Sequence, residues 1–197
     1  PVMPAARAAL ARALRARSSS IWRIVVSTKA RCASDAARAR PLSLLLADKR
    51  VAALGDVIER LPAGTPVYVA GQGVLDRIAG FELHRGVLAL GEKPAPPSLE
   101  SLLAQVSPDD VFVVAIGIGN HDNMGGLFRN AAAFGARAVL LDSTCCDPFY
   151  RKAIRVSVGA VLRTPFAVAD STALLEALAS AGVEALALTP SADARLA

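Results

Sequence analysis

The stretch 111–135 constrains the fold more than any other part of this sequence. Residues 111–118 are apolar apart from one glycine and rich in β-branched side chains, which is typical of a strand buried on both faces of a parallel sheet. A polar loop is expected at 120–123, and the apolar spacing from Gly125 predicts a helix that ends at Gly135. Ligands bind at the carboxyl ends of parallel strands, and a helix start attracts anions, so we expect a ligand site in this loop.

The flanking segments alternate between strand and helix patterns. Strands are expected at 42–47, 67–70, 87–90, 138–141 and 183–188, with a possible edge strand at 161–166 limited by Pro165. Helices are expected at 49–61, 73–79, 99–106 and 172–181, and Asp147 with Pro148 is expected to open a further helix over 149–158. This alternation predicts an α/β fold, in which a parallel sheet with helices on both faces follows a small α/β unit.

A proline-rich segment, 91–98, marks the best domain boundary in the chain. We therefore expect four parts. They are a basic Ala/Arg-rich arm over 1–40, a small α/β domain over 41–91, a proline-rich linker with a lead-in helix over 92–108, and a larger domain over 109–197.

Composition excludes several classes of protein. No apolar run approaches the roughly 18 residues that a membrane helix needs. The three cysteines, two of them adjacent, have no metal-ligand spacing, so a reducing intracellular compartment is the simpler interpretation. An aromatic content of 5% argues against recognition by rows of stacked bases.

The net charge of +5 is unevenly distributed, because residues 1–40 hold nine of the 22 basic residues and one of the 17 acidic residues. Three interpretations of this arm remain open. It could bind phosphates, it could be a targeting peptide, or it could reflect a genome that encodes Ala and Arg frequently.

Three groups of residues are candidates for function. Gly117 and Gly119 suggest a dinucleotide fingerprint, but the next glycine would have to stand at position 122, which is Asp122. A better candidate is the asparagine loop with Arg129, whose planar guanidinium suits phosphate. The third group is a basic cluster on one helix, and its members are Arg151, Lys152 and Arg155. Each histidine stands alone, so we expect no metal site.

Two blocks together resemble the SpoU (TrmH-like) branch of the SPOUT methyltransferases, which methylate the ribose 2′-hydroxyl of RNA. The first block is Asn120-x-x-Asn123-x-Gly125-x-x-x-Arg129-x-Ala131-x-x-Phe134-Gly135. The second runs from Asp147 to Gly159 and is followed by Pro165-Phe166. A weaker match, 78–89, resembles the end of the small RNA-binding domain that precedes the catalytic domain in many members.

The resemblance implies an enzyme that takes its methyl group from S-adenosylmethionine, acts on ribosomal RNA more than transfer RNA, and works in the cytoplasm as a homodimer without metal. A mitochondrial or plastid location is the alternative if residues 1–40 form a targeting peptide. By the resemblance Arg129 and Asn123 are catalytic. The implied RNA contacts are His84, Arg85, Asn120, Arg151, Lys152, Arg155 and Ser157, and Thr189 and Pro190 border the cofactor.

The sequence departs from the family pattern after the last expected strand. The Gly-x-Glu-Gly-x-Gly loop and the Ser-Leu-Asn segment, which form the knot and hold the cofactor in the family, do not occur in this sequence. We therefore expect residues 1–197 to bind the cofactor weakly or not at all, and to tend to associate. A non-catalytic RNA-binding protein is the alternative function, and a nucleotide-dependent oxidoreductase is a weaker one.

Overall fold

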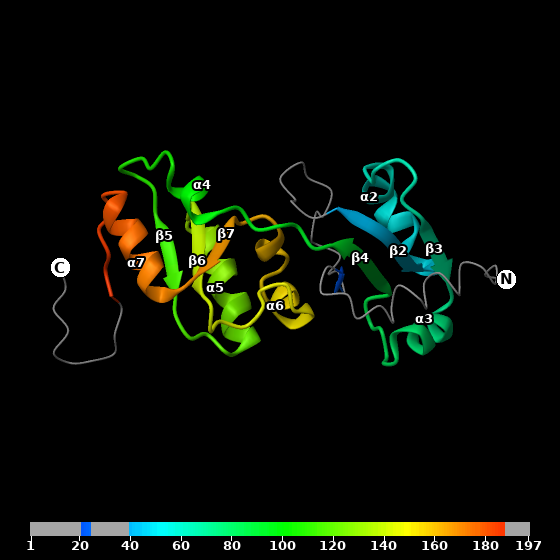
Figure 1. Cartoon of the computed structure of the whole chain (residues 1–197). Helices are drawn as coiled ribbons and strands as arrows, with labels where there is room; N and C mark the ends of the chain where they lie inside the picture. The colour runs from blue at the N-terminus through cyan, green and yellow to red at the C-terminus, as the bar shows by residue number, and fades with distance from the viewer. Residues whose placement is uncertain (1–20, 25–39, 188–197) are drawn as a thin grey trace.

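The computed structural model describes residues 21–24 and 40–187, which form two sheets that lie side by side and are joined by an extended segment (Figure 1). The first sheet has the strand order β1-β4-β2-β3, and the second has the order β5-β6-β7. Each sheet has its own apolar core. The described part of the chain is therefore two α/β units in succession.

The first sheet is mixed. Its strands are β1 (Ile21–Ile24), β2 (Pro41–Ala47), β3 (Val67–Ala70) and β4 (Val87–Glu92). Strand β2 runs parallel to β3, whereas β4 is antiparallel to both β1 and β2. Helix α3 (Gln72–Ala79) packs its buried Leu75 against Leu45 and Ala47 of β2. The pattern of residues 18–40 predicts no regular structure, so β1 extends this sheet beyond the range 41–91.

The helix expected over 49–61 is wrong in its detail. This segment forms two 3₁₀ turns, Asp48–Arg50 and Ala52–Leu54, and then the short helix α2 (Gly55–Glu59). The N–H groups of Val51 and Leu54 bond to carbonyls three residues back, as in a 3₁₀ helix. Gly55, a weak helix former, stands at the junction and helps to keep the segment from forming one long helix.

The second sheet is wholly parallel, with helices on both of its faces, which confirms the fold class expected from the sequence. Its strands are β5 (Phe112–Ala115), β6 (Ala138–Asp142) and β7 (Phe166–Ala169), and the helices around it are α4 (Leu99–Leu103), α5 (His121–Ala133), α6 (Arg151–Val156) and α7 (Ser171–Ser180), with a 3₁₀ turn at Ala160–Leu162. Figure 1 shows α5 and α6 on one side of the sheet and α7 on the other.

Strand β6 is the centre of this second unit because side chains of both its faces are buried. Val139 and Leu141 belong to the core beneath α5 and α6, whereas Ala138 and Leu140 pack with Leu174 of α7. Alternate residues of a strand point to opposite faces, so an uninterrupted apolar run is what a doubly covered strand requires.

The third strand of this sheet is not the one we expected. Residues 183–187 carry no regular structure, and Leu188 lies outside the described residues. The N–H of Val183 donates to the carbonyl of Leu178 and so closes the end of α7. The third strand is β7 instead. Pro165 immediately precedes it and accepts the N–H of Val139, so this proline introduces the strand rather than limiting it.

Candidate nucleic-acid interface

The chain turns sharply where β5 ends. Gly117 has a φ of +68°, which few other residues tolerate, and its N–H donates to Oδ1 of Asp142 at 2.9 Å. The strand therefore stops at Ala115 rather than at the expected residue 118, and the side chain of Ile116 is exposed. This turn directs the following asparagine segment to the carboxyl edge of the sheet.

The carboxylate of Asp142 organises this edge through its hydrogen bonds. It is buried, and it accepts hydrogen bonds from Gly117, from the Thr144 hydroxyl at 2.8 Å and from the Cys145 thiol at 3.2 Å. These bonds, with the Gly117 N–H first, lower the pKa of Asp142 to about 2. Burial raises the pKa of the Cys145 thiol, so the sulfur stays protonated at neutral pH. No group of three or more His, Cys, Asp or Glu among the described residues is arranged to hold a metal ion.

The expected polar loop 120–123 is the cap and first turn of α5. The side-chain oxygen of Asn120 accepts the N–H groups of Asp122 at 2.7 Å and Asn123 at 3.4 Å, so the helix begins at His121 instead of Gly125. The side chain of Asn123 is exposed in this first turn.

Arg129 projects from the same helix, with an exposed side chain and no ion pair among the described residues. It stands six residues after Asn123, which is a rise of roughly 9 Å along a helix axis. We expected Arg129, one turn into the helix, to lie near the asparagine loop, and the structure places Asn123 and Arg129 on successive turns of α5. The contacts of the described residues include no hydrogen bond between these two side chains.

Gly125 lets α6 approach α5 closely. A Cβ atom at this position would lie 2.7 Å from the Ala153 carbonyl oxygen and 2.7 Å from Cβ of Val156. Its neighbour Gly126 has open space around it. Gly125 therefore sets the distance between the helix that carries Arg129 and the helix that carries the basic cluster.

The helix expected to open at Asp147 begins later, at Arg151. Residues 147–150 form a turn, in which Oδ1 of Asp147 accepts the N–H of Phe149 at 2.9 Å and Oδ2 pairs with Lys93 at 2.9 Å. Tyr150 is the residue before the first turn of α6, and the basic residues Arg151, Lys152 and Arg155 are exposed on this short helix.

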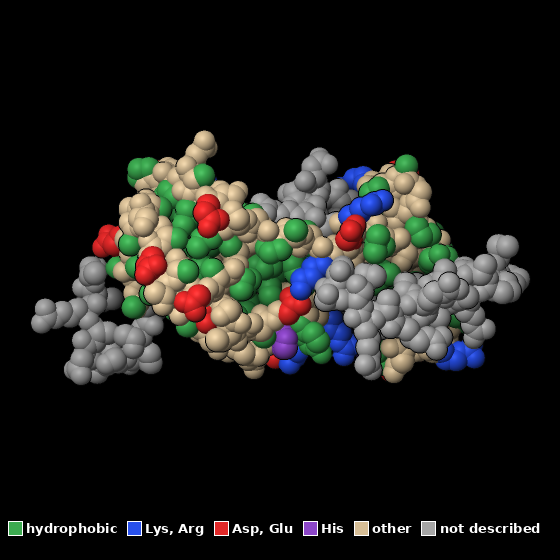
Figure 2. Space-filling model, viewed as in Figure 1, with side chains coloured by type: hydrophobic (Ala, Val, Ile, Leu, Met, Phe, Trp, Pro, Cys, Tyr) green, Lys and Arg blue, Asp and Glu red, His purple; other side chains and the backbone are tan. Residues whose placement is uncertain are grey.

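A cleft of about 860 Å³ separates α6 from the loop that joins α3 to β4. One wall is the loop Gly80–Arg85, and the other is formed by Tyr150, Arg151, Lys152 and Arg155. Among the described residues, four permanent cations and a histidine line the cleft against a single carboxylate, that of Glu82. Figure 2 shows Lys and Arg side chains along the junction between the two units. This cleft is suited to a polyanion.

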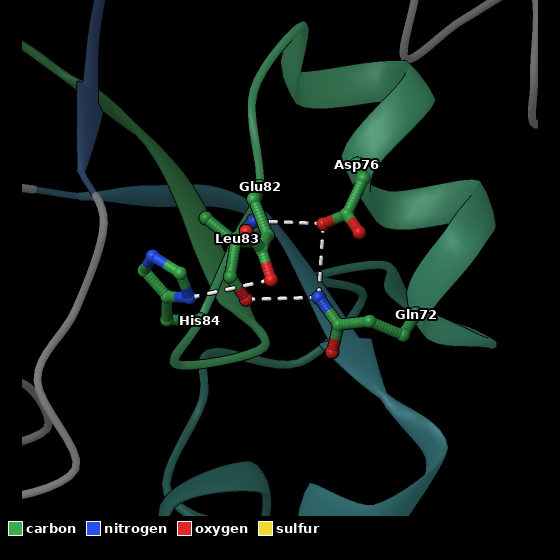
Figure 3. A network of polar contacts seen from close by, with 5 residues as sticks. All are labelled: Gln72, Asp76, Glu82, Leu83 and His84. Atoms are coloured by element: carbon green, nitrogen blue, oxygen red, sulfur yellow. Dashed lines mark hydrogen bonds and ion pairs between the residues drawn. The ribbon is translucent and has the colours of Figure 1, made fainter.

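The loop wall of the cleft is held by a small network behind it (Figure 3). Oδ1 of Asp76 accepts the N–H of Leu83 at 2.7 Å, and Nε2 of Gln72 donates both to Asp76 Oδ1 and to the Leu83 carbonyl, each at 2.9 Å. The Leu83 side chain is buried. Nδ1 of His84 lies 3.6 Å from Oε1 of Glu82. The loop is therefore anchored at Leu83, while the side chains on either side of Leu83 line the cleft.

The structure gathers most of the residues expected to contact RNA in this one cleft. They come from both units, and they are His84, Arg85, Arg151, Lys152 and Arg155. Ser157 is placed elsewhere, because its side chain is buried and its hydroxyl donates to the Ile154 carbonyl at 2.9 Å. The side-chain oxygen of Asn120 is used in capping α5. Thr189 and Pro190 lie outside the described residues.

Sequence reasoning missed two residues of the cleft, Phe81 and Tyr150. The ring of Phe81 lies 5.5 Å from the Arg151 guanidinium carbon, and the ring of Tyr150 lies 4.2 Å from that of His121, centroid to centroid. Both residues lie within the matched blocks, Phe81 in 78–89 and Tyr150 in 147–159, but only the fold shows that they share a site.

The fold and the cleft together define a class of α/β protein. A parallel sheet, whose first strand leads into an asparagine-capped helix, is joined to a smaller unit, and a basic cleft lies between the two. Residues 110–196 match the family described as the SpoU rRNA Methylase family. This match confirms the resemblance seen in the motifs of the sequence.

Named relatives agree with this assignment. A tRNA/rRNA methyltransferase of Mycobacterium tuberculosis, itself described as uncharacterized, is 39% identical over 160 residues, which are 81% of this chain and 54% of the relative. One from Haemophilus influenzae is 30% identical over 91 residues, covering 46% of this chain and 26% of the relative. The chain spans about half the length of the mycobacterial relative.

Solved structures show the same fold. An RNA 2′-O ribose methyltransferase superposes with a TM-score of 0.72 at 24% identity, over 94% of this chain and 70% of that one. The SpoU methyltransferase AviRb of Streptomyces viridochromogenes, in complex with AdoMet, gives a TM-score of 0.67 at 19% identity, over 90% and 68% of the two chains. None of the helices in the described ranges has the length and hydropathy of a membrane span.

Proposed function

We propose that the gene product containing this sequence is an RNA methyltransferase that transfers a methyl group from S-adenosylmethionine to a ribose 2′-hydroxyl. Three things support the proposal: the SpoU-family domain, relatives described as tRNA/rRNA methyltransferases, and the likeness in fold to a 2′-O ribose methyltransferase. Because the chain spans about half of these relatives, the activity is proposed for the whole protein.

The observation that carries the proposal is the basic cleft beside the first turn of α5. Arg85 comes from the smaller unit and Arg155 from the larger, yet both line one cleft. Lys152 of the cleft wall pairs with Asp122, which precedes Asn123 in the first turn of α5. Phosphate contacts position a nucleic acid on a protein, so RNA held in the cleft would extend toward the helix that carries the catalytic candidates.

For Arg129 we propose a role in positioning and charge stabilisation. A guanidinium group keeps its proton in proteins and is therefore a poor base. Its exposed position, without an ion pair in the described ranges, leaves it able to grip the phosphate next to the target ribose and to stabilise negative charge as the 2′-hydroxyl loses its proton. Asn123, six residues earlier in the first turn of the same helix, would orient the ribose. Both roles place the hydroxyl for attack, so positioning supplies much of the catalysis.

The cofactor is proposed as S-adenosylmethionine, which supplies an electrophilic methyl group. An AdoMet-bound rRNA methyltransferase of Sinorhizobium meliloti shares the fold, with a TM-score of 0.65 at 18% identity over 88% of this chain and 63% of that chain. Within the described residues, Gly119 beside the cap of α5 has nothing within 4 Å of where a Cβ would lie, so a ligand could approach the backbone there. Thr189 and Pro190 remain proposed contacts.

Finer assignments are also proposals. Ribosomal RNA is preferred to transfer RNA as the substrate because a small leading unit precedes the SpoU domain, as in the family resemblance. We propose a homodimer in the cytoplasm, and we keep the four-part division at residues 40, 91 and 108 as a working map of the domains.

The test is methyl transfer from labelled S-adenosylmethionine to total RNA from cells that lack the gene. The proposal expects label in RNA, recovered after nuclease digestion as a 2′-O-methylnucleoside. RNA from cells that retain the gene should accept less label, because its target is already methylated. Salt-dependent RNA binding with no transfer would favour a non-catalytic RNA-binding protein instead.

A further inference from the structure

Two aromatic rings are exposed inside the basic cleft. The side chain of Phe81 is 42% exposed and that of Tyr150 is 47% exposed, and the two come from opposite walls. Large aromatic side chains left open to solvent among cations are a common feature of sites that bind flat ligands.

The ring of Phe81 is covered by a cation from the other wall. The guanidinium carbon of Arg151 lies 5.5 Å from the ring centroid, and the Arg151 side chain is itself exposed. An exposed cation–π contact of this kind stabilises less than the stacking of a nucleic-acid base on an aromatic ring. A ligand that has both a base and a phosphate can therefore stack its base on the Phe81 ring, while its phosphate binds Arg151 more strongly than the ring does.

Tyr150 is held from one side by His121, with ring centroids 4.2 Å apart and planes inclined at 41°. His121 is the first residue of α5, so this contact links the cleft to the turn that contains Asn123. The ring is thereby oriented while about half of its surface stays accessible.

The loop that carries Phe81 is already ordered. Asp76 and Gln72 bind both backbone groups of Leu83, two residues beyond Phe81 (Figure 3). A preformed loop loses less conformational entropy when a ligand binds, so the Phe81 ring can serve as a rigid platform.

We propose that the cleft holds an unpaired nucleotide of the RNA, with its base stacked on Phe81 and the adjoining base against Tyr150, while Arg151 moves from the ring to a phosphate. This inference rests on the proposed function and specifies its substrate as single-stranded RNA near the methylated site. Bases of an A-form duplex are stacked on one another and closed to such rings, whereas unpaired bases can be splayed onto them. Two rings suit one or two bases, which agrees with the low aromatic content of the chain.

The experiment uses the 197-residue chain and short single-stranded RNAs that carry one 2-aminopurine, a base whose fluorescence is quenched when it stacks. We expect quenching on binding at two adjacent positions along the RNA. In Phe81→Leu the quenching at one of these positions should be lost and the affinity should fall about tenfold, while the salt dependence stays unchanged because no phosphate contact is removed. Tyr150→Leu should weaken binding and Tyr150→Phe should not.

Two matched variants separate stacking from charge. Phe134→Leu removes an aromatic ring that is 87% exposed and lies outside the cleft, and should bind as the wild type does. Arg151→Ala should flatten the salt dependence yet keep the quenching, because it uncovers the Phe81 ring. A duplex of the same sequence should bind more weakly and be indifferent to Phe81→Leu.

The proposal is overturned if single-stranded and duplex RNA bind equally well, if wild-type protein quenches no 2-aminopurine, or if Phe81→Leu retains full quenching. The wild-type measurement stands even if a variant fails to fold. Methyl transfer is assayed separately, so a failure here with transfer intact would leave the proposed function standing.

Discussion

The Nζ atom of Lys152 lies 2.6 Å from the Oδ2 atom of Asp122, which ties α6 to the first turn of α5. Both side chains are 46% exposed, so the pair contributes little to stability, about 0–1 kcal/mol. The ion pair matters more for the binding of RNA. Lys152 is already neutralised by a carboxylate, whereas Arg155 has no ion pair among the described residues, although both line the cleft.

This difference predicts unequal effects on RNA binding. Arg155→Ala should flatten the dependence of log K on log salt by about 0.7, the value of one single-strand phosphate contact. Lys152→Ala should change it less, because lysine must leave Asp122 before it can bind a phosphate. Binding titrations over a range of salt give both slopes. Arg163→Ala, an exposed arginine outside the cleft, is the control; equal slopes for Lys152→Ala and Arg155→Ala would show that the ion pair has no influence.

Two adjacent glycines in α5 should respond oppositely to alanine. Gly125→Ala would force a Cβ to within 2.7 Å of the Ala153 carbonyl oxygen, so we expect a loss of about 1–3 kcal/mol in the free energy of unfolding. Gly126→Ala meets open space and should raise it by about 0.5–1 kcal/mol, because alanine is the better helix former. Urea denaturation measures both changes. A stabilised Gly125→Ala would mean that α5 and α6 are not this close.

Asp142 should make stability depend on pH in acid. Its folded-state pKa, about 2, lies below the ordinary value of 3.8, so its contribution is fully present above about pH 4 and is lost as the pH falls toward 2. Asp142→Asn should therefore be less stable than wild type at pH 7, and the gap should narrow below pH 4. The measurement is thermal unfolding at a series of pH values. A gap that stays constant from pH 7 to pH 2 would contradict the bonding assigned to this carboxylate.

The network behind the cleft predicts a loosened loop when Asp76 is changed. Hydrogen bonds from Leu83 first, then from Gln72, lower the pKa of Asp76, so its charged form is the one that holds the loop. Asp76→Ala should speed hydrogen exchange at the Leu83 amide and weaken RNA binding, with the second sheet unaffected. Asp56→Ala, which removes an exposed carboxylate paired with Arg60 elsewhere in the first unit, is the matched control. Unaltered exchange at Leu83 in Asp76→Ala would refute the anchoring role.

Much of the fold could be predicted from local patterns. The continuous apolar run at 138–141 requires cover on both faces, and β6 is buried on both. The third strand could not be recognised in this way. Residues 183–188 also have an apolar pattern typical of a strand, but the short strand β7 is selected by pairing with β6, and this is a contact distant in sequence.

The candidate site could be predicted residue by residue, but not as a cleft. Motifs identified Arg85 and Arg155, yet only the packing of two units shows that they face each other. The start of helix α5 was predicted wrongly for a similar reason. The sequence predicts that Asn120 belongs to a polar loop, but in the structure it caps a helix. The sequence alone does not show which N–H groups the side-chain oxygen will accept.

Arg129→Ala should abolish methyl transfer while RNA binding falls only modestly and the thermal midpoint is unchanged, because the side chain is exposed. The control is again Arg163→Ala. The measurement is the rate of methyl transfer at saturating RNA, and a wild-type rate in Arg129→Ala would remove this residue from the site.

The most direct measurement compares two synthetic RNAs that differ by one oxygen atom. Once the methylated nucleotide is mapped, one RNA carries its natural ribose and the other carries 2′-deoxyribose at that nucleotide alone. The account predicts methylation of the first and none of the second, with similar binding of both. Methylation of the deoxy RNA at the same nucleotide would show that the acceptor lies on the base, and would contradict the assignment of the ribose 2′-hydroxyl.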